Sequence, residues 1–292
     1  MLKKNSNVDI FIYSHIPFIP VTHDHVYKVL TNCEDTASVF QTDLEIFRDF
    51  TGNNISDKNL MFNEYSGFYW IWKNYPIKDY VGMNHYRRMY EMYDDLPNID
   101  DIFKSGKKII LNKPINLIVH EGLPQAGTTM NNKDWYEYWH NVKDLELLGE
   151  IINDLYPEYM DGFELMCNAT YLYPSSMFIM DKQTFNTYCE YIFSILNEFR
   201  FRRGFWDVED SVKYVEEHKD EYIKPYLGYY DVKMQSRIIG YLAERALATF
   251  LMHGGENSLE QNAEIFNWGM IAEETYKAKL FIPEGYKIVK DK

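Results

Sequence analysis

The chain has 292 residues, of which 46% are hydrophobic and 17% aromatic, so it holds enough apolar material for the core of one large domain. Its formal net charge of -14 gives the molecule a field that repels phosphate backbones and anionic membrane surfaces, and any anion must therefore be bound locally. The 3 cysteines stand far apart and outside any metal-binding spacing, which argues against a disulfide framework and a structural zinc site.

Cysteine usage and hydropathy also bear on location. Unpaired cysteines favour a reducing compartment. The first apolar run is short and polar residues follow it, so it is typical of a strand rather than of a signal peptide. No run approaches the roughly 18 apolar residues of a membrane span. We therefore expect a cytoplasmic protein without a membrane span.

Apolar runs and helical spacing predict alternating strands and helices. Buried strands are predicted at residues 8–13, 79–83, 107–111 and 171–180. Helices are predicted at residues 63–75, 182–203 and 235–252, the second between an Asp181 cap and Gly204. Residues 21–60 show a mixed pattern, and residues 121–143 are expected to form a long functional loop over the sheet. This alternation is typical of an α/β sheet.

Polar side chains follow two of the predicted strands at the points where they end. His15 follows the first strand, and the segment NHYRR, residues 84–88, follows the second. In open α/β sheets the ligand lies beyond the carboxyl ends of the strands, and the planar fork of arginine matches phosphate oxygens. A diphosphate is therefore the expected guest of Arg87 and Arg88. The alternative is that either arginine pairs with an acidic side chain such as Asp94 for structure alone.

Three blocks of the sequence resemble bacterial capsule and exopolysaccharide glycosyltransferases of a former unknown-function class. The first block is ISDKNLMFNEYSGFYWIWKNYPIKDYVGMNHYRRMY at residues 55–90, with a WxWKN helix before an HYRR strand end. The others are SMFIMDKQTFNTYCEYIFSILNEF at 176–199 and QSRIIGYLAERALATFL at 235–251. Two positions depart from the family pattern: the first strand ends in Ser14-His15-Ile16 rather than His-Lys, and Ser176 replaces a common asparagine.

The resemblance implies a single GT-A-like (Rossmann-type) α/β domain over residues 1–292, with a mostly parallel central sheet and C-terminal helices. The donor-binding part is expected at about residues 1–120 and the acceptor part at about 121–292. The implied donor is a nucleotide sugar, with a uridine-diphosphate sugar favoured. The implied acceptor is a glycan or a lipid-linked glycan in polysaccharide biosynthesis.

The same resemblance, with the strand-end positions, assigns residues to each part of the site. Glu244 and His85 are the predicted catalytic residues. The predicted donor-binding residues are His15, Glu64, Tyr65, Asn84, His85, Tyr86, Arg87 and Arg88. The predicted acceptor-binding residues are Met177, Arg237 and Arg245. Tyr65, Tyr69 and Trp72 could stack on a sugar or a base, but their helical spacing favours the core.

An inverting enzyme needs a base for the acceptor hydroxyl, and Glu244 is the first candidate. Residues 237, 241, 244 and 248 share one face of the last predicted helix, which is either a solvent face or a site face. The match to the family block favours the site. Glu64, Asp181 and Asp231 are weaker alternatives.

GT-A enzymes commonly hold a divalent ion with an Asp-x-Asp pair after a central strand, and here HYRR stands at that position. Arginine and histidine can stabilise a leaving diphosphate electrostatically, so we expect no cofactor and favour a metal-independent reaction, with Mn or Mg as the alternative. The acidic residues at 94–95, 100–101 and 207–210 remain possible ligands, although solvated loop charges are the simpler interpretation. His23-Asp24-His25 lacks a third ligand and is assigned to the surface.

The leading prediction is thus a glycosyltransferase that moves a hexose, such as galactofuranose, onto a growing surface glycan. One alternative is a phage-type enzyme that acts on hydroxymethylated DNA bases, with FRFRR at 199–203 and Lys107-Lys108 as a basic track. The other is a non-catalytic nucleotide-sugar binding module.

Overall fold

The computed structural model describes residues 4–33, 42–228 and 231–271. Its strands are β1 Val8–Ser14, β2 Tyr27–Thr31, β3 Ile46–Arg48, β4 Tyr80–His85, β5 Arg88–Tyr90, β6 Ile109–Asn112, β7 Ile115–Asn116, β8 Tyr171–Leu172, β9 Phe178–Asp181, β10 Ala263–Phe266 and β11 Trp268–Met270. Its α-helices are α2 Asn59–Phe62, α3 Tyr65–Asn74, α4 Ile99–Lys104, α5 Asn132–Trp139, α6 Val142–Leu155, α7 Met160–Asn168, α8 Lys182–Arg203, α9 Val208–Glu217, α10 Lys219–Tyr222, α11 Val232–Gln235, α12 Ile238–Met252 and α13 Glu256–Asn262. Short 3-10 turns are η1 Ser56–Lys58, η2 Pro157–Tyr159 and η3 Pro174–Ser176.

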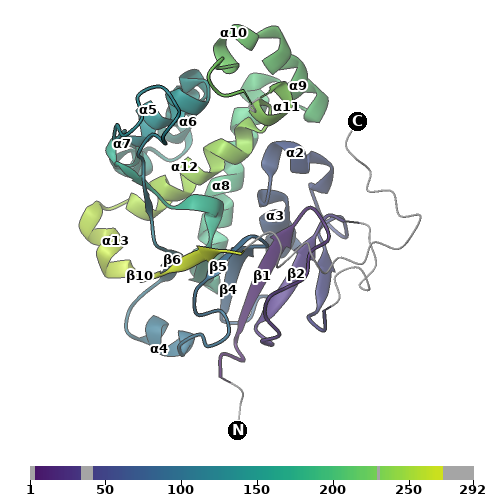
Figure 1. Cartoon of the computed structure of the whole chain (residues 1–292). Helices are drawn as coiled ribbons and strands as arrows, with labels where there is room; N and C mark the ends of the chain where they lie inside the picture. The colour runs from purple at the N-terminus through teal and green to yellow at the C-terminus, as the bar shows by residue number, and fades with distance from the viewer. Residues whose placement is uncertain (1–3, 34–41, 229–230, 272–292) are drawn as a thin grey trace.

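The central sheet has the strand order β10-β6-β9-β4-β1-β2-β3. Strand β9 runs antiparallel to both β4 and β6, and the other neighbours on this path are parallel. Helices α5 to α12 gather on one side of the strands (Figure 1). The predicted fold class is therefore confirmed: an α/β protein with a mostly parallel sheet and C-terminal helices.

The order of the strands creates a switch point between β1 and β4. The chain leaves β1 for β2 and β3 on one side, and then returns through α2 and α3 to β4 on the other side of β1. When the chain connections of two neighbouring parallel strands lead to opposite sides of the pair, a crevice forms at the carboxyl ends of the strands. Many α/β proteins bind their ligands in this crevice. The ends of β1 and β4 are therefore where a ligand site is expected.

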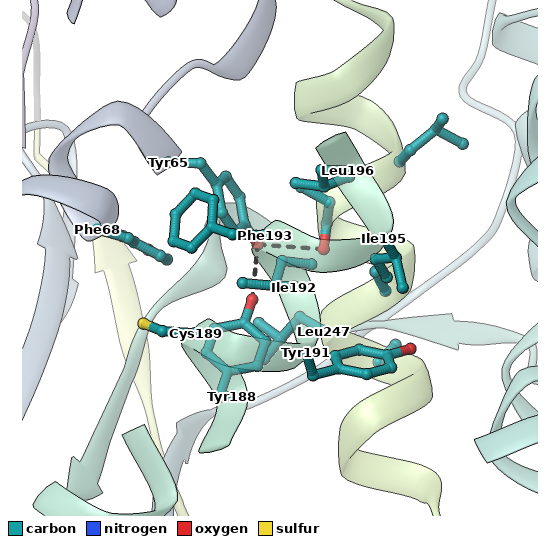
Figure 2. Packing of buried hydrophobic residues seen from close by; sticks show 14 of the residues in the cluster. Tyr65, Phe68, Tyr188, Cys189, Tyr191, Ile192, Phe193, Ile195, Leu196 and Leu247 are labelled. Carbon is teal, nitrogen blue, oxygen red and sulfur yellow. Dashed lines mark hydrogen bonds between the residues drawn. The ribbon is translucent and has the colours of Figure 1, made fainter. Parts of the chain in front are cut away.

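Two apolar clusters hold the sheet, one on each face. Alternate residues of β1 divide between them, since Phe11 joins the cluster that faces α3, α8 and α12, whereas Ile10 and Ile12 join the other. Figure 2 shows the helical side, where Tyr65 and Phe68 of α3 pack beside Tyr188 and Ile192 of α8. The aromatic spacing of α3 thus serves the core.

The structure corrects several predicted elements. The strand predicted at 171–180 is broken into β8 and β9 by η3, where Ser175 and Ser176 have positive φ values of 66° and 48°. Part of the predicted loop at 121–143 is the helix α5, whose Tyr136 is fully buried. The helix predicted at 235–252 divides into α11 and α12 at residues 236–237. The sequence pattern at 21–60 concealed β2 and β3, which are only five and three residues long.

Two predicted helix ends are confirmed by their caps. The Asp181 carboxylate accepts hydrogen bonds from the backbone N–H groups of Gln183 and Thr184 at 2.8 and 2.9 Å, which begins α8. Gly204 ends the same helix in the left-handed conformation with φ 71°. Local chemistry alone was sufficient to place these boundaries.

Candidate active site

The two histidines that follow β1 and β4 lie close together. Tyr13 of β1 pairs with His85 of β4 in parallel register. The ring of Tyr86 lies between the two histidines, 5.8 Å from His15 and 4.5 Å from His85 between centroids. The proximity expected from the strand ends is therefore observed, and it falls at the switch point.

A tight hairpin between β4 and β5 fixes the protonation state of His85. His85 pairs with Arg88 in antiparallel register, with residues 86–87 as the turn. The Arg87 backbone N–H donates to Nδ1 of His85 at 3.1 Å, so the neutral ring carries its proton on Nε2. Burial lowers the pKa of His85 well below 6.5, and the charges of Arg88 and Arg87 lower it further. His85 is thus a neutral imidazole with one N–H to donate.

Arg87 and Arg88 bring positive charge to this edge of the sheet. Among the described residues neither guanidinium forms an ion pair, and the Nε of Arg87 is buried without a hydrogen-bond partner. Asp95 pairs instead with Lys4 at 3.1 Å. Burial and the charge of Arg87 lower the pKa of Arg88, while the carboxylates of Glu244 and Glu64 act in the opposite direction. The described part of the chain therefore does not support the structural pairing with acidic residues at 94–95.

Helix α12 contributes a polar face to the same place. Arg237, Tyr241 and Glu244 are partly exposed, whereas the residues between them are buried. The Nε of Arg237 donates to Oδ1 of Asn63 at 2.7 Å. The Glu244 carboxylate accepts from the backbone N–H of Ser175 at 3.0 Å and from the Arg245 guanidinium at 3.1 Å. The face that the sequence predicts for residues 237, 241 and 244 is therefore observed, and its charged side chains contact Asn63 and Ser175.

Glu64, at the start of α3, faces these charges. Burial raises its pKa to about 7, and the nearby carboxylate of Glu244 raises it as well. The charges of Arg237 and Arg88 partly offset that rise. Two carboxylates that face each other in a desolvated place cannot both ionise cheaply. Near neutral pH, Glu64 can therefore hold or release a proton.

We call these residues the switch-point cluster, which comprises His15, Glu64, His85, Arg87, Arg88, Arg237 and Glu244. Its members come from β1, the β4–β5 hairpin, α3 and α12, so they are distant in sequence and joined only by the fold. Within the described residues no group of three or more histidine, cysteine or acidic side chains is arranged to hold a metal ion. The cluster can bind an anion, donate a hydrogen bond and accept a proton.

Other predicted site residues lie behind the cluster. Tyr65 is fully buried, and its hydroxyl is within hydrogen-bond distance of Ser176 Oγ at 2.7 Å and of Tyr188 at 3.1 Å (Figure 2 shows the latter). Met177 is buried in the apolar core cluster on the sheet face opposite the helices. Arg245 is 3% exposed and contacts Glu244 rather than the surface. Packing encloses all three side chains, and the contacts with donor or acceptor predicted for them stay predictions.

Asn84 and Tyr86 are also enclosed. Asn84 lies beside Ile12 in the register of β4 with β1 and is 3% exposed. Neither its amide oxygen nor its amide nitrogen has a hydrogen-bond partner among the described residues. Tyr86 packs between the two histidine rings and Phe18. Asn84 thus lies within the sheet at the switch point, and Tyr86 lies in the turn that follows β4.

Five of the other acidic candidates form structural contacts. The carboxylates of Asp181 and Asp231 cap α8 and α11, and Asp207 forms a capping box with Asp210 at the start of α9. Asp100 accepts from Tyr80 at 2.9 Å. His23 contacts Asp43 at 2.7 Å on the surface.

The basic track predicted for DNA is not assembled. Arg203 pairs with the buried Asp144 at 2.7 Å. Arg202 pairs with Asp154 and Glu198, both at 2.8 Å. With two of the three arginines at 199–203 neutralised by partners, little charge remains there for a phosphate backbone.

Comparison with known proteins supports the fold and identifies the family. The family described as "Domain of unknown function (DUF4422)" matches residues 9–223. No curated protein matches the chain. Among solved structures, the apo structure of the WbbM bifunctional glycosyltransferase is similar with a TM-score of 0.63 and 24% identity, over 91% of this chain and 46% of that one. The chain thus spans under half the length of that protein, and the likeness shows a shared fold. No helix in the described ranges is both long and apolar enough to traverse a bilayer.

The electrostatics of the cluster predict that His85 does not titrate near neutral pH. Its 15N ring resonances should keep the shifts of a neutral imidazole from pH 8 down through pH 6, since desolvation and neighbouring cations disfavour the imidazolium. Replacing Arg88 with Met removes one of those cations and should raise the midpoint. A His85→Gln variant assigns the signal. A wild-type midpoint at 6.5 or above would contradict the proposed surroundings of the ring.

Proposed function

The chain belongs to the DUF4422 family, and we propose that it is a glycosyltransferase that moves a hexose, such as galactofuranose, from a nucleotide sugar to an acceptor hydroxyl. The observation that carries the proposal is the switch-point cluster, where three arginines and a neutral histidine face two carboxylates on a fold shared with a glycosyltransferase. We favour a uridine-diphosphate donor and a glycan or lipid-linked glycan acceptor in capsule biosynthesis. Three free cysteines support a reducing, cytoplasmic setting.

The arginines serve the donor in this proposal. As the acceptor oxygen bonds to the anomeric carbon, the bond from that carbon to the diphosphate breaks and negative charge develops on the leaving group. Arg87 and Arg88 supply fixed positive charge there, and Nε2–H of His85 can donate a hydrogen bond. Such groups stabilise developing charge more strongly in a partly desolvated place than in bulk water.

The proton of the acceptor hydroxyl needs a base, and the cluster offers two. We propose Glu244, because it lies on the partly exposed face of α12 and its carboxylate is held by Ser175 and Arg245. Glu64 is the alternative, since a pKa of about 7 matches a general base at neutral pH. If Glu64 instead keeps its proton, it leaves the negative charge on Glu244.

A panel of nucleotide sugars tests the function directly. The protein is incubated with each donor, with and without glycan acceptors, and the release of free nucleotide is measured. We expect slow hydrolysis of one donor and faster release with the correct acceptor. Binding of a donor without any turnover would favour the non-catalytic binding module instead.

Two isosteric variants separate the candidate bases. Glu244→Gln keeps the shape but removes the basic carboxylate, so turnover should fall by about two to four orders of magnitude. Glu64→Gln should cost less than about tenfold, because it mimics the protonated form. Rates are measured from pH 5.5 to 8.5. The reverse ranking, with an inflection near pH 7 that is lost in Glu64→Gln, would assign the base to Glu64.

Arginine variants test the metal-independent interpretation. Activity is expected to survive excess EDTA, because guanidinium groups take the place of the ion at the diphosphate. Arg87→Lys or Arg88→Lys should lower turnover, since an ammonium cannot reproduce bidentate contact with phosphate oxygens. Loss of activity with EDTA that manganese restores would reject the metal-free proposal. Full activity in both lysine variants would make the arginines structural.

A further inference from the structure

Asn63 has a backbone conformation that is costly for any residue other than glycine. It stands between α2 and α3 with φ 53° and ψ -135°. Left-handed φ values strain side chains with a Cβ atom, and strained residues persist where the surrounding structure over-determines them, often at functional sites. Asn63 directly precedes Glu64 and touches Arg237, so its strain lies within the switch-point cluster.

Asn63 is held in this conformation by a hydrogen-bond network that ends at a buried carboxylate. Its carbonyl oxygen accepts from Nδ2 of Asn59 at 2.7 Å, and the same amide donates to Oγ of Ser66 at 2.9 Å. Ser66 in turn donates to the carboxylate of Asp49 at 2.8 Å, and Tyr13 donates to it at 3.1 Å. Asp49 is fully buried. The network ties Asn63 to the end of β1, so its position is fixed by the sheet.

The side chain of Asn63 lies against a glycine of α12. A Cβ atom built on Gly240 would come within 1.9 Å of Nδ2 of Asn63, which no real contact allows. Gly240 therefore leaves the space that the Asn63 amide occupies. The other end of that amide, Oδ1, accepts from Nε of Arg237 at 2.7 Å. Contact with Nε leaves the terminal nitrogens of the guanidinium, and within the described ranges Nη1 has only a 3.8 Å contact to the Met234 sulfur.

We infer that Asn63 is a positioning residue that holds the guanidinium of Arg237 so that its terminal nitrogens meet an anionic group of the substrate, a diphosphate. This inference rests on the proposed function, and it assigns Arg237 to the donor in place of the acceptor role predicted from the sequence. Glycine would fit the backbone of residue 63 without strain but has no acceptor for Arg237. Asparagine at position 63 therefore lowers the stability of the fold through backbone strain, and it orients the guanidinium of Arg237.

The test compares strain relief at two positions. Asn63→Gly should leave the melting temperature unchanged or raise it, yet weaken binding of uridine diphosphate about tenfold or more, the effect of one hydrogen bond to a charged group. Gln125→Gly is the matched control, because Gln125 also has a left-handed φ, of 64°, in an exposed loop. It should raise or keep the melting temperature and leave binding unchanged. Binding is measured by calorimetry with uridine diphosphate and with inorganic pyrophosphate.

A second variant guards against an Asn63→Gly protein that fails to fold. Gly240→Ala removes no polar group but displaces the Asn63 amide, so it should also weaken binding of uridine diphosphate. Wild-type affinity in either folded variant would overturn the inference.

Absence of binding by the wild type would instead count against the proposed donor site. Asn63→Gly, Arg237→Met and the double variant are then compared by urea unfolding. Non-additive stabilities would support the hold of Asn63 on Arg237, and additive stabilities would reject it.

Discussion

The parallel pairing of β1 with β4 is the constraint on which the rest of the site depends. These strands are far apart in the chain, yet Tyr13 and His85 are neighbours in their register. Since both strands run in the same direction, both carboxyl ends release their polar residues at one edge. The return of the chain through α3 then places Glu64 at that edge too. Without this pairing, the two histidines and the HYRR turn would have no common surface.

Local charge in the cluster opposes the charge of the whole protein. The chain carries a net charge of -14, but Arg87, Arg88 and Arg237 converge at the switch point with two carboxylates. Burial lowers the pKa of His85, and the arginines lower it further, because an additional positive charge would be unfavourable there. A diphosphate would supply the negative charge that the arginines attract. The carboxylates then remain available to take the proton of the acceptor hydroxyl. The same electrostatics thus serve both halves of the proposed transfer.

Backbone strain lies beside Arg237, at the N-cap of α12, and beside Glu244 within that helix. Arg237 contacts Asn63 and Glu244 contacts Ser175, and both partners have positive φ. One contact uses a side-chain oxygen and the other a backbone N–H, so only the first depends on the identity of the strained residue. Buried hydrogen bonds to Asp49 and Tyr65 keep these segments in place. Tyr65, which Figure 2 shows within the packed core, thus links that core to the segment that contacts Glu244.

The sequence by itself determined the elements whose signals are local: the buried run of β1, the aromatic spacing of α3, the Asp181 and Gly204 caps of α8, and the HYRR turn after β4. It also predicted that residues 237 and 244 share a face. Periodicity, caps and strand ends depend on neighbours in the chain, so they can be read without the fold. Only the tertiary structure decided that Tyr65, Met177 and Arg245 are enclosed, that β9 is antiparallel, and that Asn63 holds Arg237. Burial, strand direction and contacts between distant residues depend on how the helices and strands pack against one another. A local sequence pattern does not contain that information.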